Sequence, residues 1–346
     1  MSRKFVIAVL GALMVSGLAG SALASAGAGA ISLSLPIGAR YNALGEAGTA
    51  LSQDATALWW NTGGLGFLAR RYPGGDLQMM TSSLAAGLAN DIRLTWLGYG
   101  RPLGNIGAIA TSINYLDMGW QKAVDEDNNE GDDFHSYMFS VSAGYGVKIM
   151  PTLGVGVGIK YFRDSLAPDA VMQDSAGGGG SGSSFGVDFG AQLLIPQLKS
   201  RVGLSIANLG PDITHVDAAQ SDPMPRKATL GIASGRRSEY GGVLMVADLL
   251  VPLYKYVKED DVDGYVFGLD YDQNEWGVGF EFDYNYSLFL RLGWKNVSGG
   301  DIHDLTYGMG LDLNEWIGRA FIFDFAWVPQ AEGLPHVTRI TAGYRF

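Results

Sequence analysis

Apolar and polar residues alternate along most of the chain from about residue 77 onward. In the stretch 137–147 the odd positions are apolar, whereas the even positions are mostly small or polar. The same pattern recurs in the stretches 153–161, 276–284, 286–295 and 305–313. Alternation with a period of two predicts β-strands, and each stretch has about the nine to eleven residues that a tilted strand needs to cross a bilayer.

The alternation predicts fourteen strands, near residues 77–84, 91–101, 106–117, 135–148, 153–164, 184–194, 201–209, 226–235, 240–251, 275–283, 286–295, 303–313, 319–328 and 336–346. One face of these strands carries Leu, Val, Phe, Tyr and Trp. The other face carries Gly, Ser and the charged residues Lys160, Asp188, Glu281, Asp283, Arg291, Asp312, Asp324 and Arg339. This division fits a barrel with an apolar outer face, although a soluble β-sandwich also alternates.

The connections between the predicted strands distinguish these two folds. One set is short, at 102–105, 149–152, 196–200, 235–238, around Asn285 and at 314–317. The other set is mostly long and polar, at 117–134, 164–183, 210–224, 252–274, 297–301 and 329–335. The two sets alternate strictly, as the short periplasmic turns and longer external loops of outer-membrane barrels do. The sequence therefore predicts an all-β fold, a transmembrane outer-membrane β-barrel of about 14 antiparallel strands over residues 77–346.

The N-terminus predicts export from the cytoplasm. Residues 1–24 combine the basic residues Arg3 and Lys4, an apolar run at 5–18 and a final Ala-Leu-Ala. This arrangement is typical of a cleaved signal peptide rather than a membrane anchor, because the apolar run is short and small residues follow it. We expect the mature chain to begin near Ser25 and to lie in the outer membrane of a diderm bacterium, in contact with its lipid. The chain has no cysteine, so disulfides do not hold this exported protein together.

The end of the chain predicts how the barrel is assembled. Residues 340–346 alternate to the last position, which is Phe346. A terminal strand that ends on an aromatic residue resembles the signal by which the barrel-assembly machinery recognises its clients. We therefore predict that Tyr344 and Phe346 form an assembly signal and that this machinery is a partner of the chain.

The segment before the predicted strands has a different pattern. Residues 31–71 lack the period of two, are rich in Ala and Gly, and contain the adjacent Trp59 and Trp60. We predict that residues 25–76 form a hatch of turns and short helices and that residues 40–65 plug the barrel lumen. Arg40 and Asp54 are candidates to pair with inward charges such as Glu281 or Arg291, because an unpaired charge in a dry lumen is costly. The alternative is a periplasmic tail.

Two parts of this segment, Gly38–Ala50 and Asp54–Leu65, carry a family resemblance. They resemble the N-terminal hatch of the PorV/PorQ family, which belongs to the wider FadL-type group of fourteen-stranded barrels. The family pattern ends in Asn-Pro-Ala-Gly-Leu, whereas this chain has Thr62 and Gly63 in place of Pro and Ala. Ala247–Leu249 and Leu290–Lys295 also resemble family segments. The hatch residues that the resemblance singles out are Arg40, Gly45, Asp54, Asn61, Gly64 and Leu65.

The resemblance implies a protein that is not an enzyme, and it leaves two functions open. PorV-like proteins serve the type IX secretion system, where they bind the C-terminal signal domains of secreted cargo at the outer membrane. FadL-like proteins instead move long-chain fatty acids or other hydrophobic solutes through the barrel wall. A transporter should have an apolar pocket beside the hatch and a break in the wall. An adaptor for secreted cargo should have a tightly filled lumen and large external loops.

Composition and motifs argue against other kinds of site. The net charge of −11 argues against nucleic acid as a partner, since a basic stripe is needed to neutralise phosphates. Four histidines are expected near the external rim without a zinc spacing or a serine-nucleophile motif, so we predict no catalytic residue, metal or cofactor. These are His135, His215, His303 and His336. The acidic loop 259–264 approaches a calcium-loop pattern, but such loops are common on barrel exteriors.

Overall fold

The computed structural model describes residues 29–84, 91–124, 130–167, 180–215, 221–257, 265–269, 273–298, 302–314, 320–330 and 335–346. The predicted signal peptide and the acidic loop at 259–264 lie outside the described residues. So does most of the connection predicted at 314–317.

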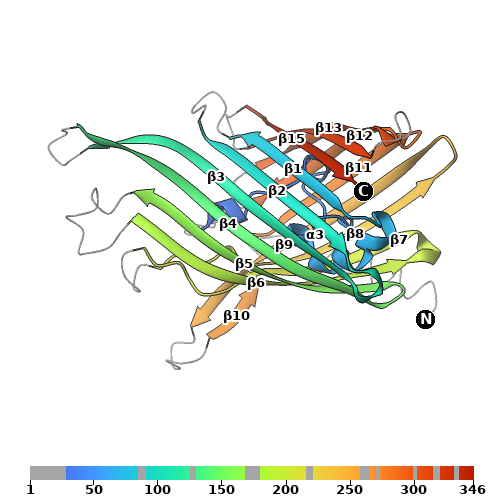
Figure 1. The fold of residues 1–346 in the computed structure, drawn as a ribbon, viewed down its shortest axis with the longest axis horizontal. Coiled ribbons are helices and arrows are strands. Elements are labelled where there is room, and N and C mark those ends of the chain that lie inside the picture. The colour runs from blue at the N-terminus through green and yellow to red at the C-terminus, as the bar shows by residue number, and fades with distance from the viewer. Residues whose placement is uncertain are drawn as a thin grey trace.

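The strands form one antiparallel sheet that closes on itself (Figure 1). Of the described strands, fourteen make the barrel, and the short strand β10 pairs only with β9. The ring closes where the first strand pairs with the last, with Leu77 opposite Tyr344. The strands are β1 (Asp76–Ser83), β2 (Arg93–Pro102), β3 (Ala108–Val124), β4 (Glu130–Met150), β5 (Leu153–Ala167), β6 (Gly180–Ile195), β7 (Ser200–Leu209), β8 (Lys227–Arg237), β9 (Gly241–Val257), β10 (Tyr265–Leu269), β11 (Glu275–Tyr284), β12 (Leu288–Val297), β13 (Ile302–Asp312), β14 (Phe321–Val328) and β15 (Val337–Arg345).

The two faces of the wall differ as the alternation predicts. Large apolar side chains lie exposed on the outer face, among them Ile159 at 62% and Phe185 at 61%. In water such a surface would be very unfavourable, whereas a bilayer solvates it. The charged residues predicted to face inward are buried, except Asp312, which is partly buried and pairs with Arg345 at 2.7 Å. The chain is therefore an outer-membrane β-barrel, as predicted.

The strands extend further than predicted at the end of the barrel with the long connections. The polar segment 117–134 is not a loop throughout, because β3 and β4 continue to pair as far as Val124 and Glu130. Figure 1 shows this hairpin projecting beyond its neighbours. The segment 252–274 likewise contains the unpredicted strand β10, which pairs with the extension of β9. These extensions are rich in polar residues and lack the alternation that predicts a strand, because neither face of a strand outside the membrane needs to be apolar.

Five short helices precede β1 within residues 29–75. They are η1 (Ile31–Leu33), α2 (Ala39–Asn42), α3 (Ala57–Trp60), η2 (Thr62–Phe67) and α4 (Leu68–Arg71). In the described part of the chain, two further 3-10 helices connect strands, η3 (Gly104–Ile106) and η4 (Pro196–Leu198). No helix in the described part of the chain is long and apolar enough to span a membrane. The largest group of buried apolar side chains lies around the N-terminal helices, so the core of the molecule is inside the ring of strands.

Candidate functional site

The segment before β1, residues 29–75, packs against the inner face of the barrel, and we refer to it as the hatch. Helix η1 contacts β3 and β4, α2 contacts β13 to β15, and η2 contacts β3 to β7. Its fully buried side chains include Ile37, Tyr41, Leu44, Leu65 and Phe67. These contacts put residues 40–65 in the lumen, whereas their action as a plug stays a prediction.

Glycines allow helix η2 to lie directly on the wall. A Cβ atom at Gly156 or Gly190 would collide with the backbone of η2 at Thr62 and Gly63. The Asn61 side chain caps η2 by accepting a hydrogen bond from Gly63 N at 3.0 Å, and it donates one to Ala191 O on β6 at 3.0 Å. Gly63 stands where the family pattern has Ala. A Cβ there would lie only 2.7 Å from Ala191 Cα, so this departure from the pattern permits the close approach.

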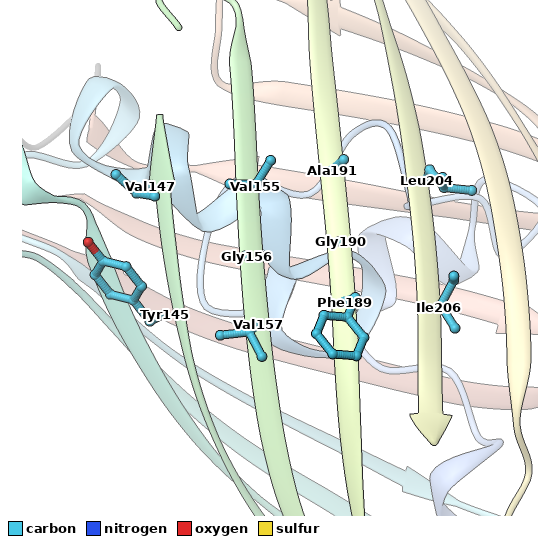
Figure 2. A pocket seen from close by; sticks show the side chains of 10 residues that line it. All are labelled: Tyr145, Val147, Val155, Gly156, Val157, Phe189, Gly190, Ala191, Leu204 and Ile206. Atoms are coloured by element: carbon cyan, nitrogen blue, oxygen red, sulfur yellow. The ribbon is translucent and has the colours of Figure 1, made fainter. Parts of the chain in front are cut away.

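The outer face of the same part of the wall is hollowed. The hollow has a volume of about 430 Å³ and lies across β4 to β7 (Figure 2). Its floor includes Ala191, Val155 and Val157, and larger side chains such as Phe189 and Leu204 stand beside them. Figure 2 shows the helices of the hatch directly behind these strands. The hollow opens away from the lumen, toward the lipid.

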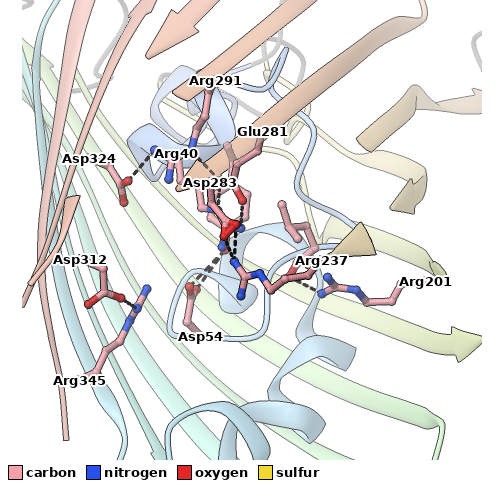
Figure 3. A network of polar contacts seen from close by, with 12 residues as sticks. Arg40, Asp54, Arg201, Arg237, Glu281, Asp283, Arg291, Asp312, Asp324 and Arg345 are labelled. Carbon is pink, nitrogen blue, oxygen red and sulfur yellow. Dashed lines mark hydrogen bonds and ion pairs between the residues drawn. The ribbon is translucent and has the colours of Figure 1, made fainter. Parts of the chain in front are cut away.

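A buried cluster of charges fastens the hatch to the opposite wall. Arg40 on α2 donates two hydrogen bonds to Glu281 on β11, from Nε at 2.9 Å and from Nη2 at 2.6 Å. Arg291 on β12 bridges Glu281 at 2.7 Å and Asp324 on β14 at 2.6 Å. Figure 3 shows these four side chains pointing toward one another. Burial alone would lower the pKa of Arg40, but the Glu281 carboxylate raises it above its ordinary value. The pairing of Arg40 with an inward carboxylate is therefore as predicted.

Among the described residues no inward cation pairs with Asp54, so that part of the prediction is wrong. Its carboxylate accepts hydrogen bonds from Thr56 N at 3.0 Å and from the Tyr41 hydroxyl at 3.2 Å, both within the hatch. Burial and the neighbouring Asp54 carboxylate hold the pKa of Tyr41 well above its usual range. The reason is local. Asp side chains readily accept hydrogen bonds from N–H and O–H groups nearby in the chain, and these donors satisfy the carboxylate without a partner on the wall.

Two further attachments were not predicted. Glu46 pairs with Lys295 on β12 at 2.7 Å and lies 3.8 Å from Arg339 on β15. Asp248 on β9 accepts hydrogen bonds from Gly48 N at 2.9 Å and Thr49 N at 2.8 Å. The signal for these was present, since Glu46 belongs to the family-like segment and Asp248 alternates with apolar neighbours on its strand.

The remaining hatch residues singled out from the sequence have structural roles. Gly45 adopts a φ of 71°, and a Cβ on it would collide with the carbonyl oxygens of Trp294 and Val278. A Cβ on Gly64 would collide with Ser52 O, and Leu65 is fully buried beside Leu58. Gly45, Gly64 and Leu65 therefore act through packing: they allow the hatch to fit the lumen and provide no reactive group.

One small hollow between the hatch and the wall is lined by charged and aromatic side chains. A hollow of about 40 Å³ lies between the hatch and strands β8, β9, β11 and β12. Trp59, Glu46, Lys227, Glu275 and Lys295 are among its lining residues, and the Lys227 ammonium lies 3.8 Å from the centre of the Trp59 ring. Because a buried water needs about 10–15 Å³ of such space, this hollow has room for a few waters.

The connection between β7 and β8 covers the start of the hatch. Ile213 and Met224 are buried in the same apolar cluster as Ala30 and Leu33. His215 fastens this connection to the wall, since its Nε2 lies 2.9 Å from the Asp164 carboxylate on β5. The hatch is thus enclosed at the end of the barrel with the long connections as well as at its sides.

The other histidines do not gather. His135 contacts Asp117 at 2.8 Å and His336 contacts Asp304 at 3.6 Å, each in a separate place. Within the described residues no group of three or more His, Asp or Glu side chains could hold a metal ion. These pairs are ordinary contacts near the strand ends.

The two C-terminal aromatic residues lie at the seam of the barrel. Tyr344 packs against Phe321 with ring centres 4.8 Å apart, and Phe346 stacks on Tyr99 at 6.2 Å. Phe346 N donates a hydrogen bond to Gly75 O at 3.0 Å, so the last residue contacts the end of the hatch. Their role as an assembly signal stays a prediction.

Comparison with known proteins adds the family and the fold. The family model described as type IX secretion system protein PorV matches residues 24–236, more than half of the chain. No curated protein sequence matches the chain. Among solved structures, the Pseudomonas putida toluene transporter TodX is similar with a TM-score of 0.56 and 12% identity, over 90% of this chain and 98% of its own.

Two other solved structures give the same picture. A Pseudomonas aeruginosa FadL homologue has a TM-score of 0.53 and 12% identity, over 89% of this chain and 98% of its own. The Ralstonia pickettii toluene transporter TbuX has a TM-score of 0.52 and 12% identity, over 90% of this chain and 98% of its own. At these identities the likeness establishes a shared fold and says nothing about the substrate.

Proposed function

Because this chain belongs to the family of the type IX secretion system protein PorV, we propose that it is a non-enzymatic adaptor barrel of protein secretion. Its partners would be the C-terminal signal domains of cargo that has crossed the outer membrane. In this proposal the barrel is an anchor and the binding surface lies outside the lumen.

The filled lumen is the observation that supports an adaptor most strongly. Hatch side chains bind or contact the inner face of most strands, and the space left beside the charged residues is about 40 Å³. Pockets for small molecules usually measure about 300–1,000 Å³ and are mostly apolar. A hollow of this size suits a closed support better than a route for a hydrophobic solute.

The external end offers the larger surface for a protein partner. The β3–β4 hairpin extends past the paired residues Trp120 and His135, and its exposed residues include Glu130, Asp132 and Asp133. An acidic, projecting hairpin favours a partner with basic residues on the facing surface, because complementary charge speeds encounter and rejects like-charged proteins. We assign the first contact with cargo to this hairpin.

The rival function is the transport of fatty acids or other hydrophobic solutes. The solved structures with this fold include toluene transporters, and a shared fold hosts different functions. A transporter needs an apolar cavity beside the hatch that is large enough for its solute, whereas the hollow found there measures about 40 Å³ and has Glu46, Lys227 and Lys295 among its lining residues. The fourteen described strands of the barrel also pair with both neighbours around the whole ring.

The proposal is tested in the organism by removing the gene. Cargo carrying the C-terminal signal domain should then disappear from the cell surface and medium, while growth on long-chain fatty acids stays unchanged. Complementation with the full chain should restore secretion. A variant that lacks residues 122–133 should not restore it. In this variant Gln121 and Phe134 can form a two-residue turn between the paired Trp120 and His135, so the hairpin still closes. Normal secretion together with lost uptake of hydrophobic solutes would instead establish the rival function.

A further inference from the structure

The short-turn end of the barrel carries a charge opposite to that of the chain as a whole, which has a net charge of −11. In an outer-membrane barrel this end is the periplasmic one. Its exposed basic residues lie in helix α4 of the hatch and at the four short connections between β2 and β9; they are Arg70, Arg101, Lys148, Lys199, Arg236 and Arg237. The chain around them has a single acidic residue, Glu239, in the stretches 65–75, 100–110, 144–158, 192–205 and 233–241.

Two of these cations lie on the inner side of the rim, away from the lipid. Lys148 is opposite Gly154 in the register of β4 and β5, so the two residues share a face. A Cβ on Gly154 would lie 2.5 Å from Gly63 O of the hatch, which identifies that face as the inner one. Arg70 belongs to the hatch itself. Gly66, four residues earlier, is so close to β4 that a Cβ there would lie 3.2 Å from Lys148 N. Arg70 and Lys148, the inner pair, therefore belong to the same side of the periplasmic mouth.

The inner pair also differs from its neighbours in lacking a counterion. Arg237 forms an ion pair with Asp283. Among the described residues, by contrast, no carboxylate forms an ion pair with Arg70 or Lys148, and both side chains are exposed. Like charges that are not neutralised add up to a positive potential over the surface that carries them. The mouth is therefore a surface that attracts negative charge from the periplasm.

The extent of this basic surface indicates the kind of partner. It reaches from β2 to β8, six steps between neighbouring strands, or about 29 Å at the usual strand spacing. A small anion would meet one or two of these side chains, whereas an extended chain with several carboxylates can follow the rim. Lipid headgroups surround the outer face of the wall, so a partner that reaches the inner pair comes from the aqueous periplasm.

We propose that the periplasmic mouth binds an acidic segment of a periplasmic protein, with carboxylates beside Arg70 and Lys148. Complementary charge speeds the encounter of the two proteins and rejects partners with a basic surface. The β3–β4 hairpin lies at the opposite end of the barrel, so this surface is separate from the one assigned to cargo. The chain would thus have a second contact, on the periplasmic side of the membrane.

The test uses the full-length protein in phosphatidylcholine nanodiscs and a fluorescent peptide of alternating Glu and Ser. About nine residues suffice for the peptide to span the basic surface when extended. The variant Arg70→Gln, Lys148→Gln removes the inner pair. The matched control is Arg101→Gln, Arg236→Gln, which removes the same charge from the outer side of the same end. These arginines pair in register with Ile109 and Val243, whose side chains are exposed on the outer face.

The acidic peptide should bind saturably, and a peptide of alternating Gln and Ser should not. Removing the inner pair should weaken binding about fivefold and the control less than about twofold, as expected for exposed ion pairs. High salt should abolish this difference, because it screens exposed charges. Should the double variant not fold, Lys148→Gln alone should weaken binding about twofold.

Three results would overturn the proposal. The first is the absence of saturable binding of the acidic peptide. The second is equal weakening by the inner-pair variant and its control. The third is a loss of bound phosphatidylglycerol in the inner-pair variant, seen by native mass spectrometry, with peptide binding unchanged. That result would assign Arg70 and Lys148 to lipid headgroups.

Discussion

Deleting residues 40–65 is expected to turn a barrel that passes no measurable current into a conducting channel. The deletion removes α2, α3 and most of η2, and with them the groups that fill the lumen. The inward charges left behind, such as Glu281 and Arg291, would then line a water-filled passage, where hydration replaces the lost pairing. In planar bilayers the deletion variant should give discrete channel steps, and the full chain should give a flat baseline.

The control for this experiment is a deletion that removes residues outside the lumen. Removing residues 122–133 shortens an external hairpin and should leave the baseline flat. If the assembled 40–65 deletion conducts no more than the full chain, the hatch does not seal the lumen. Free cleavage of residues 40–65 by a protease added from the periplasmic side of the intact protein would lead to the same conclusion.

Replacing Glu281 with Gln is expected to cost about 3–5 kcal/mol of stability, the range found when one partner of a buried ion pair is removed. Glu281 binds Arg40 and Arg291 at once, and its side chain is only 6% exposed. Arg291 keeps Asp324, whereas Arg40 loses the carboxylate that it binds. The urea concentration at which the folded band is lost on an unheated gel should fall accordingly.

An exposed ion pair provides the matched control. Lys122 and Glu130 pair at the external end with side chains that are 50% and 68% exposed. Glu130→Gln should therefore change the stability by less than about 1 kcal/mol, as surface pairs do. Equal urea midpoints for Glu281→Gln and the parent would show that the charged cluster does not fasten the hatch.

Most of the barrel follows from the sequence because the membrane imposes a strict rule. Lipid requires apolar side chains on the outer face, so the alternation is visible wherever a strand crosses the bilayer. The start of β1 at Asp76 and the end of β14 at Val328 accordingly differ from their predicted positions by at most one residue. Outside the bilayer the outer face need not be apolar. For that reason the alternation did not predict the extension of β4 to Glu130 or the strand β10.

The attachments of the hatch follow from the sequence only in part. A carboxylate partner for Arg40 could be predicted, since a buried guanidinium needs a negatively charged partner and several carboxylates face inward. Asp54 accepts hydrogen bonds from Thr56 and Tyr41, which are near it in the sequence. These local hydrogen bonds form in place of a long-range ion pair with the wall. The contact of Asp248 with Gly48 N depends on backbone positions, which no side-chain pattern reveals.

The most direct test of the adaptor function is the binding of a cargo domain to the purified barrel. The full chain, in lipid nanodiscs, is titrated with an isolated C-terminal signal domain of secreted cargo from the same bacterium. We predict saturable one-to-one binding, weakened about tenfold or more, a loss of at least about 1.4 kcal/mol, when residues 122–133 are removed. Absence of saturable binding to the cargo domain, together with saturable binding of a long-chain fatty acid in the lumen, would contradict the account.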